Sequence, residues 1–174
     1  MNSLIITITL MISAGLIAGS IIFWSLKLGI GPTPTSSKVR SSIRRIIPDD
    51  VSGEIIELGC GWGHLIPILR EKYPSKKIHA WERSPIPAIF TQGVYRIEVK
   101  RDDFFKANFE KAGFIICYLF PGAMERVEKE IIPQLPPGCW ILTHTFSLSK
   151  RVPVKTLKAN DLYQTQVYLY QTPL

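Results

Sequence analysis

The chain has 174 residues, of which 46% are hydrophobic and 20% are charged, and its formal net charge is +7. This composition suits one globular domain of ordinary size with an additional apolar segment. The three cysteines, at positions 60, 117 and 139, are scattered and form no C-x-x-C pair. The sequence therefore argues against a disulfide framework and against a zinc site, and we expect no metal.

The first segment of the chain is apolar enough to cross a membrane. Residues 1–26 contain no Asp, Glu, Lys, Arg or His, and residues 4–25 are mostly apolar. A helix of about 20 residues spans the roughly 30 Å hydrocarbon core of a bilayer. A cleaved signal peptide favours a basic start and a shorter apolar core, and a buried helix of this length favours one polar face. We therefore predict an uncleaved transmembrane anchor at residues 1–28.

Basic residues follow the apolar run at residues 4–25, whereas no charged side chain precedes it; they are Lys27, Lys38, Arg40, Arg44 and Arg45. The positive-inside rule then predicts a single-pass protein whose folded domain lies on the cytoplasmic side. The positive charge after the anchor indicates either attraction to an acidic partner or anionic lipid, or an ordinary solvated surface, which we favour for most of these residues. No aromatic-basic RNA motif is present, so nucleic acid is not an expected partner.

A linker rich in glycine and proline is expected at residues 29–37, between the anchor and a folded domain at residues 38–174. Residues 38–47 have the spacing of a short basic amphipathic helix. Predicted strands and helices then alternate: strands at 54–58, 77–82, 95–99, 113–120 and 139–145, and helices at 63–72, 85–92 and 123–132.

This alternation predicts an α/β, Rossmann-like, mostly parallel sheet with helices on both faces. Two consecutive strands at 152–158 and 163–171 have no helix between them. They predict that an antiparallel C-terminal strand closes the sheet.

The central motif is Glu57-Leu58-Gly59-Cys60-Gly61-Trp62-Gly63, which follows a predicted strand and opens a predicted helix. Glycine suits such a turn because a ligand must approach the backbone closely. The spacing is G-x-G-x-G after an acid, whereas dinucleotide sites have G-x-G-x-x-G and hold a pyrophosphate, which an acid would repel. The motif predicts a ligand that carries a positive amino group and a sulfonium.

Further acids follow the next two predicted strands. Glu82 lies about 20 residues on, where a carboxylate can accept hydrogen bonds from both ribose hydroxyls. Asp102 or Asp103 can accept from an adenine amino group while Phe104 packs on the ring. Ligands of open α/β sheets bind at the carboxyl edge, so these elements together predict a nucleoside site. The alternatives are a plain turn, a helix cap at either aspartate and a surface ion pair of Glu82.

Taken together, these residues resemble class I S-adenosylmethionine-dependent methyltransferases over roughly residues 32–170. A narrower resemblance, to a family of small protein lysine methyltransferases, rests on Pro34-Thr35-Ser36-Ser37-Lys38-Val39, on residues 136–146 and on Val167-Tyr168-Leu169-Tyr170. That family includes a broad-specificity archaeal enzyme and mitochondrial enzymes that modify ATP synthase subunit c and the adenine nucleotide carrier. The resemblance implies a seven-stranded sheet, S-adenosylmethionine as the cofactor and a protein lysine as the acceptor.

The acceptor side is expected after the fourth and fifth predicted strands. A lysine must lose a proton before it is methylated, and a dry aromatic pocket lowers its ordinary pKa of about 10.4. Tyr118 and Phe120 are candidates for that pocket, and His144 could take the proton. The alternatives are core roles for both aromatic residues and a structural hydrogen bond for His144. We expect three further residues to bind the substrate: Thr35, Pro121 and Phe146.

The sequence therefore predicts an enzyme that methylates a lysine of a membrane or membrane-proximal protein, with the anchor raising the local substrate concentration. Three alternatives stay open. They are a methyltransferase for a small-molecule or lipid-soluble acceptor, a non-catalytic nucleoside-binding module, and a nicotinamide-dependent oxidoreductase, which the glycine spacing disfavours.

Overall fold

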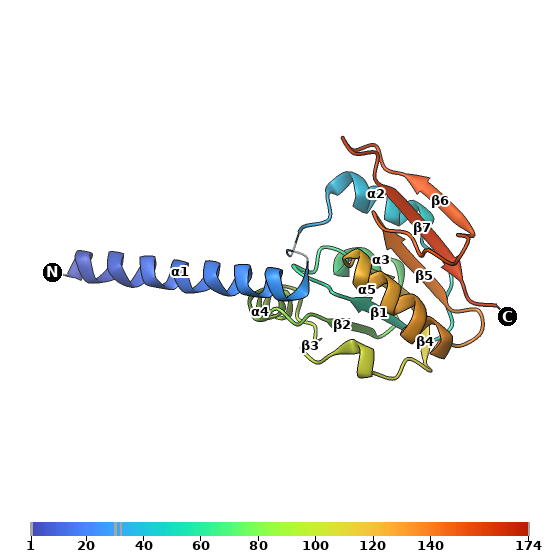
Figure 1. The fold of residues 1–174 in the computed structure, drawn as a ribbon, viewed down its shortest axis with the longest axis horizontal. Coiled ribbons are helices and arrows are strands. Elements are labelled where there is room, and N and C mark those ends of the chain that lie inside the picture. Colours follow the sequence, from blue (N-terminus) through green and yellow to red (C-terminus); the bar gives the residue numbers. More distant parts are fainter. Residues whose placement is uncertain (1, 30, 32, 174) are drawn as a thin grey trace.

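The computed structural model describes residues 2–29, 31 and 33–173 (Figure 1). A long N-terminal helix, α1 (Asn2–Leu28), projects from an α/β domain, with the N-terminus at its far end (Figure 1). By length and composition alone, α1 qualifies as a membrane span or as a signal sequence. Every described side chain from residue 3 to residue 19 is exposed, so α1 meets the domain only through its last turns.

The domain is built on one seven-stranded sheet in the order β3-β2-β1-β4-β5-β7-β6. The first five strands of the chain pair in parallel, and β7 pairs antiparallel with both β5 and β6. This confirms the predicted fold class. The strands are β1 (Glu54–Leu58), β2 (Ile78–Trp81), β3 (Val99–Lys100), β4 (Ala112–Cys117), β5 (Trp140–His144), β6 (Lys155–Lys158) and β7 (Gln166–Gln171).

Helices cover both faces of this sheet because its central strands are apolar on both sides. Side chains alternate between the faces. Ile55 of β1 packs with α2 and α3, whereas the next residue, Ile56, packs with α5 and the turns that continue it. The helices are α2 (Ser37–Ile46), α3 (Ile66–Lys72), α4 (Pro85–Tyr95) and α5 (Pro121–Arg126), which continues as a π-helical turn at Val127–Ile131 and a 3-10 turn at Ile132–Gln134.

Several element boundaries differ from those predicted. The helix expected from Gly63 starts only at Ile66, because the glycine turn before it holds backbone angles that no helix adopts. The helix expected to end at residue 92 continues to Tyr95, where Arg96 adopts a left-handed conformation and ends it. The strand expected at 95–99 is consequently reduced to two residues, Val99 and Lys100.

The fourth and last predicted strands are also shorter than expected. β4 ends at Cys117, and the residues up to Phe120 leave the sheet before Pro121 begins α5. β7 starts at Gln166, since a turn before it is held by Asp161, whose carboxylate accepts from the backbone and hydroxyl of Thr165. The shortening of β4 matters for function, because it frees three side chains at the carboxyl edge of the sheet.

Candidate active site

A cleft of about 230 Å³ opens at the carboxyl edge of the sheet, beside the end of α1. The loops that follow β1, β2 and β4 form most of its walls, together with Asp103 and Phe104 beyond β3. The carboxyl ends of parallel strands meet at one edge, and ligands of open α/β sheets bind there. The cleft therefore lies where the glycine motif and the acids were expected to converge.

The glycine turn after β1 lines this cleft through Gly59, Cys60 and Gly61. Gly61 has a φ of +51°, and a Cβ built on it would have no neighbour within 4 Å, so its backbone faces open space. Gly63 differs. Its φ is +71°, and a Cβ there would lie 2.7 Å from side chains of Thr91 and Tyr95 in α4, so this glycine permits close packing of a helix and lies outside the cleft lining.

Glu82 connects the glycine turn to the loop after β2. One carboxylate oxygen accepts a hydrogen bond of 3.0 Å from the backbone N–H of Gly61, and the other accepts one of 2.7 Å from the N–H of Ser84. The side chain is buried and lines the cleft. Each carboxylate oxygen keeps a further lone pair, so the same group can accept hydrogen bonds from two ribose hydroxyls.

Glu57, at the end of β1, is the most perturbed acid of the site. It is 3% exposed, and among the described residues no hydrogen-bond donor reaches its Oε2. Burial, and then the nearby charge of Glu82, raise the pKa of Glu57 to about 8. A buried carboxylate oxygen without a partner is costly unless a donor reaches it. The amino group of S-adenosylmethionine is such a donor, so the acids present fit this cofactor.

The two aspartates after β3 are placed differently. Asp103 lines the cleft, and its carboxylate also caps the short 3-10 turn Phe104–Lys106 by accepting a hydrogen bond of 3.2 Å from the N–H of Phe105. Asp102 is exposed and lies outside the cleft lining. Phe104, the next residue, is buried and also lines the cleft. Of the two candidates, only Asp103 is therefore in position to reach a ligand.

Cys60 is buried in the wall of the cleft. Burial raises the pKa of its thiol far above the ordinary range. The side chain is therefore a neutral, compact part of the wall and no nucleophile.

The predicted acceptor residues come together as a stack of aromatic rings. The ring of Tyr118 lies 4.3 Å from that of His144, with an interplanar angle of 21°, and 6.3 Å from that of Phe146, with an angle of 10°. Tyr118, Phe120 and Thr35 line the cleft, whereas Pro121, His144 and Phe146 lie outside the lining. His144 and Phe146 therefore stack with the Tyr118 ring without lining the cleft themselves.

His144 is 3% exposed, and burial lowers its pKa to about 4. Its Nε2 lies 3.5 Å from the hydroxyl oxygen of Thr35, and its Nδ1 lies 3.2 Å from that of Thr145. The imidazole is thus neutral at physiological pH and held between two hydroxyls. Together, His144, Thr35 and Tyr118 join the loop before α2 to the ends of β4 and β5.

Some residues that line the cleft were not predicted from the sequence. The end of α1 and the following segment contribute Lys27, Leu28, Gly31 and Thr33. The ring of Phe120 lies 3.3 Å from where a Cβ of Gly29 would stand, so α1 ends against the acceptor side. Trp62 and Arg126 also line the cleft. Thr35, a predicted substrate-binding residue, lies within the expected linker at residues 29–37, and this was a signal that the linker itself approaches the site.

The fold, the acidic glycine turn and the cleft at the carboxyl edge define a class I methyltransferase that uses S-adenosylmethionine. More particularly, the chain belongs to the ANTKMT methyltransferase domain family, whose model matches residues 57–155. It is also 26% identical, over 148 residues, to a protein-lysine N-methyltransferase of Saccharolobus islandicus (strain REY15A), covering 80% of this chain and 90% of that relative.

Solved structures share the fold. An RNA methyltransferase from Salinibacter ruber in complex with S-adenosyl-L-homocysteine matches with a TM-score of 0.66 and 22% identity, over 81% of this chain and 94% of that one. Human N-acetylserotonin methyltransferase in complex with S-adenosylmethionine matches with a TM-score of 0.59 and 16% identity, over 78% of this chain and 52% of that one. The acceptors of these two enzymes differ, so the likeness concerns the sheet and its helices.

Proposed function

We propose that this enzyme transfers methyl groups from S-adenosylmethionine to a lysine side chain of a protein at a membrane surface. The observation that carries the proposal is the composition of one cleft, in which buried acids, an aromatic wall and the end of α1 face each other. The similarity to a protein-lysine N-methyltransferase supports the choice of acceptor. Because the cleft adjoins an apolar helix, we choose a membrane-proximal protein over a freely soluble one.

The roles of the residues follow from their chemistry. Glu57 would hold the amino group of the cofactor, Glu82 its ribose hydroxyls, and Asp103 with Phe104 its adenine. When bound, S-adenosylmethionine supplies a methyl group on a positively charged sulfur, which is already activated for displacement. The protein's own contribution is to hold donor and acceptor in line and to exclude water.

On the acceptor side, we assign Tyr118 and Phe120 to the wall that receives the lysine side chain, with Thr35 at its mouth. An apolar wall lowers the pKa of the amine, which favours the neutral form that can accept a methyl group. His144, with its pKa of about 4, is a weak base at neutral pH, so we assign it the positioning of the Tyr118 ring and let water carry the proton away.

We also propose that residues 1–28 anchor the protein in a membrane, with residues 29–37 as the linker and residues 38–174 as the cytoplasmic domain. Two features of α1 support a membrane-spanning role. Four of its Thr and Ser hydroxyls donate to carbonyls one turn earlier, which satisfies them without water; they are Thr7, Thr9, Ser13 and Ser25. At its end, the Lys27 Nζ lies 4.9 Å from the ring of Trp24, a pairing typical of the membrane interface.

The test uses the full chain reconstituted in lipid nanodiscs, with S-adenosylmethionine labelled in its methyl group and with membranes as the source of acceptor. We expect a labelled protein band that releases methyllysine on acid hydrolysis. Label recovered only in the organic extract would replace the lysine acceptor with a lipid-soluble one. The mass of the purified protein distinguishes a retained anchor from a cleaved signal sequence.

A further inference from the structure

Helix α4, which follows β2, exposes its apolar face and buries its small and polar one. Ile89, Phe90 and Val94 are 64%, 45% and 56% exposed, whereas Thr91 and Ala88 are buried. At 3.6 residues per turn, Ile89, Phe90 and Val94 lie on one side of the helix, and Gly93 falls between them. A helix facing water would have the reverse pattern, so we expect an apolar partner to cover the exposed face of α4.

The position of α4 indicates what covers it. In Figure 1, α4 is seen nearly end-on beneath the last turns of α1, whereas the axis of α1 lies in the plane of the picture. The two helices therefore cross. They are in contact. Because residues 3–19 of α1 are all exposed, that contact falls within residues 20–28, where Ile21, Trp24 and Leu28 are partly buried.

This arrangement fixes the depth of α4 relative to the proposed span. Lys27 marks the end of the apolar run, and Ile21 lies six residues earlier, which is about 9 Å along a helix axis. Helices that lie in the plane of a membrane bury their apolar faces about 5–10 Å into the boundary between headgroups and acyl chains. A helix that crosses α1 at this level therefore lies within that boundary.

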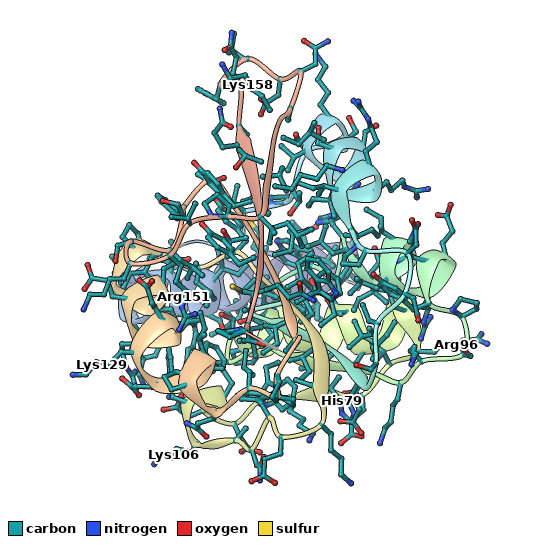
Figure 2. All side chains as sticks on the ribbon, turned by 90° about the vertical axis from the view of Figure 1, so that its right-hand side faces the viewer. His79, Arg96, Lys106, Lys129, Arg151 and Lys158 are labelled. Atoms are coloured by element: carbon teal, nitrogen blue, oxygen red, sulfur yellow. The ribbon has the colours of Figure 1, made fainter. Side chains whose placement is uncertain are left out.

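The charges of α4 fit the same surroundings. The eleven residues of α4 (Pro85–Tyr95) include no Asp, Glu, Lys or Arg. Arginines stand just outside both ends, at positions 83 and 96. In the view of Figure 2, from the side remote from α1, the labelled Arg96 lies at the rim of the domain. Arginines beside an uncharged interfacial helix are placed to contact anionic lipid headgroups.

We propose that α4 is a second membrane contact, an interfacial helix that inserts Ile89, Phe90 and Val94 into the lipid surface on which α1 is anchored. The proposal rests on the anchor assigned to residues 1–28. Because α4 packs on the glycine turn through Thr91, whose hydroxyl donates to the carbonyl of Gly61, it also fixes the mouth of the cleft at the membrane surface. A lysine close to the bilayer would then reach the cleft, whereas one held far above it would not.

The test measures the surroundings of single spin labels in the full chain, reconstituted in vesicles of phosphatidylcholine and phosphatidylglycerol. The native cysteines are buried, so labels are introduced through Val94→Cys and Ile89→Cys. Two further variants act as references. Leu16→Cys reports on the anchor, and Val152→Cys, at a site that is 92% exposed and precedes β6 at the opposite edge of the sheet, reports on water.

For each label, the ratio of its collision rate with oxygen to its collision rate with a water-soluble nickel chelate is measured. We expect this ratio to be several times higher at positions 89 and 94 than at position 152. Ratios at 89 and 94 equal to that at 152, with the label at 16 in lipid, would overturn the α4 contact and leave the anchor intact. A label at 16 in water would overturn the anchor and the α4 contact together. None of these outcomes depends on methyl transfer, so the proposed acceptor is tested separately.

Discussion

Replacing Glu57 by glutamine should stabilise the ligand-free enzyme and, at the same time, weaken its hold on S-adenosylmethionine. The carboxyl group is 3% exposed and its pKa is raised to about 8 from an ordinary value of 4.5. The folded protein therefore retains a proton that the unfolded chain releases between these two pH values. Wild-type stability consequently falls as the pH rises through this window.

The size of the effect follows from the same two values. They differ by about 3.5 pH units, each worth 1.36 kcal/mol, which corresponds to about 5 kcal/mol. The Glu57→Gln variant has nearly the same shape and no titratable proton. Its free energy of unfolding, relative to that of the wild type, should rise between pH 4.5 and pH 8 by up to about this amount and then level off.

The assay is urea denaturation of the full chain in mild detergent, followed by tryptophan fluorescence at several pH values from 4.5 to 8.5. All other carboxyl groups are common to both proteins, so the difference reports on Glu57 and on its interaction with Glu82. Calorimetric titration at pH 7.5 should show S-adenosylmethionine binding the variant about tenfold or more weakly, because the uncharged amide oxygen accepts a weaker hydrogen bond from the cofactor's ammonium group than a carboxylate does. Stability curves that run parallel across this pH range would refute the reasoning.

Three further predictions concern the rest of the site. Gly63→Ala should lower the free energy of unfolding by at least about 1 kcal/mol more than Gly61→Ala in urea denaturation, since both have positive φ but only a Cβ at 63 meets α4 side chains at 2.7 Å. Tyr118→Leu should slow methyl transfer about tenfold or more while leaving the calorimetric affinity for S-adenosylmethionine unchanged, because the residue is assigned to the acceptor. His144→Phe should lower the rate of transfer without changing the shape of its pH profile between 5 and 7.5, since a histidine with a pKa of about 4 does not titrate there.

Each of these predictions has its own contrary result. Equal losses of stability for the two glycine variants would remove the packing role of Gly63. A large loss of cofactor affinity in Tyr118→Leu would move this residue to the donor side. A step near pH 6.5 that disappears in His144→Phe would make the imidazole a base in the reaction, as the sequence alone allowed.

The sheet and the acidic turn were predictable because both follow from local pattern and topology. Alternation of strands and helices requires a parallel sheet, and a parallel sheet brings the ends of its strands to one edge. Glu57 and Glu82 could therefore be placed in one site although 24 other residues separate them in the sequence.

Other features depend on contacts that local pattern does not encode. Asp102 and Asp103 are chemically alike, and only the path of the chain after β3 turns the second toward the cleft. The stack of Tyr118, His144 and Phe146 joins the carboxyl ends of two different strands, β4 and β5, so no single window of sequence contains it. The contribution of α1 to the cleft was missed because an apolar segment followed by a linker indicates that the helix stands apart from the folded domain. In the structure, Gly29, directly after α1, lies against Phe120 of the cleft wall.

The account rests on the carboxylate of Glu82, which lies at the cleft and holds the glycine turn through Gly61 and Ser84. Calorimetric titration of S-adenosylmethionine into the full chain and into its Glu82→Gln variant tests this most directly. We predict that the variant, still folded by circular dichroism, binds at least about tenfold more weakly, because an amide offers one acceptor where the carboxylate offers two. Equal affinity of the two proteins would contradict the assignment of this cleft as the cofactor site.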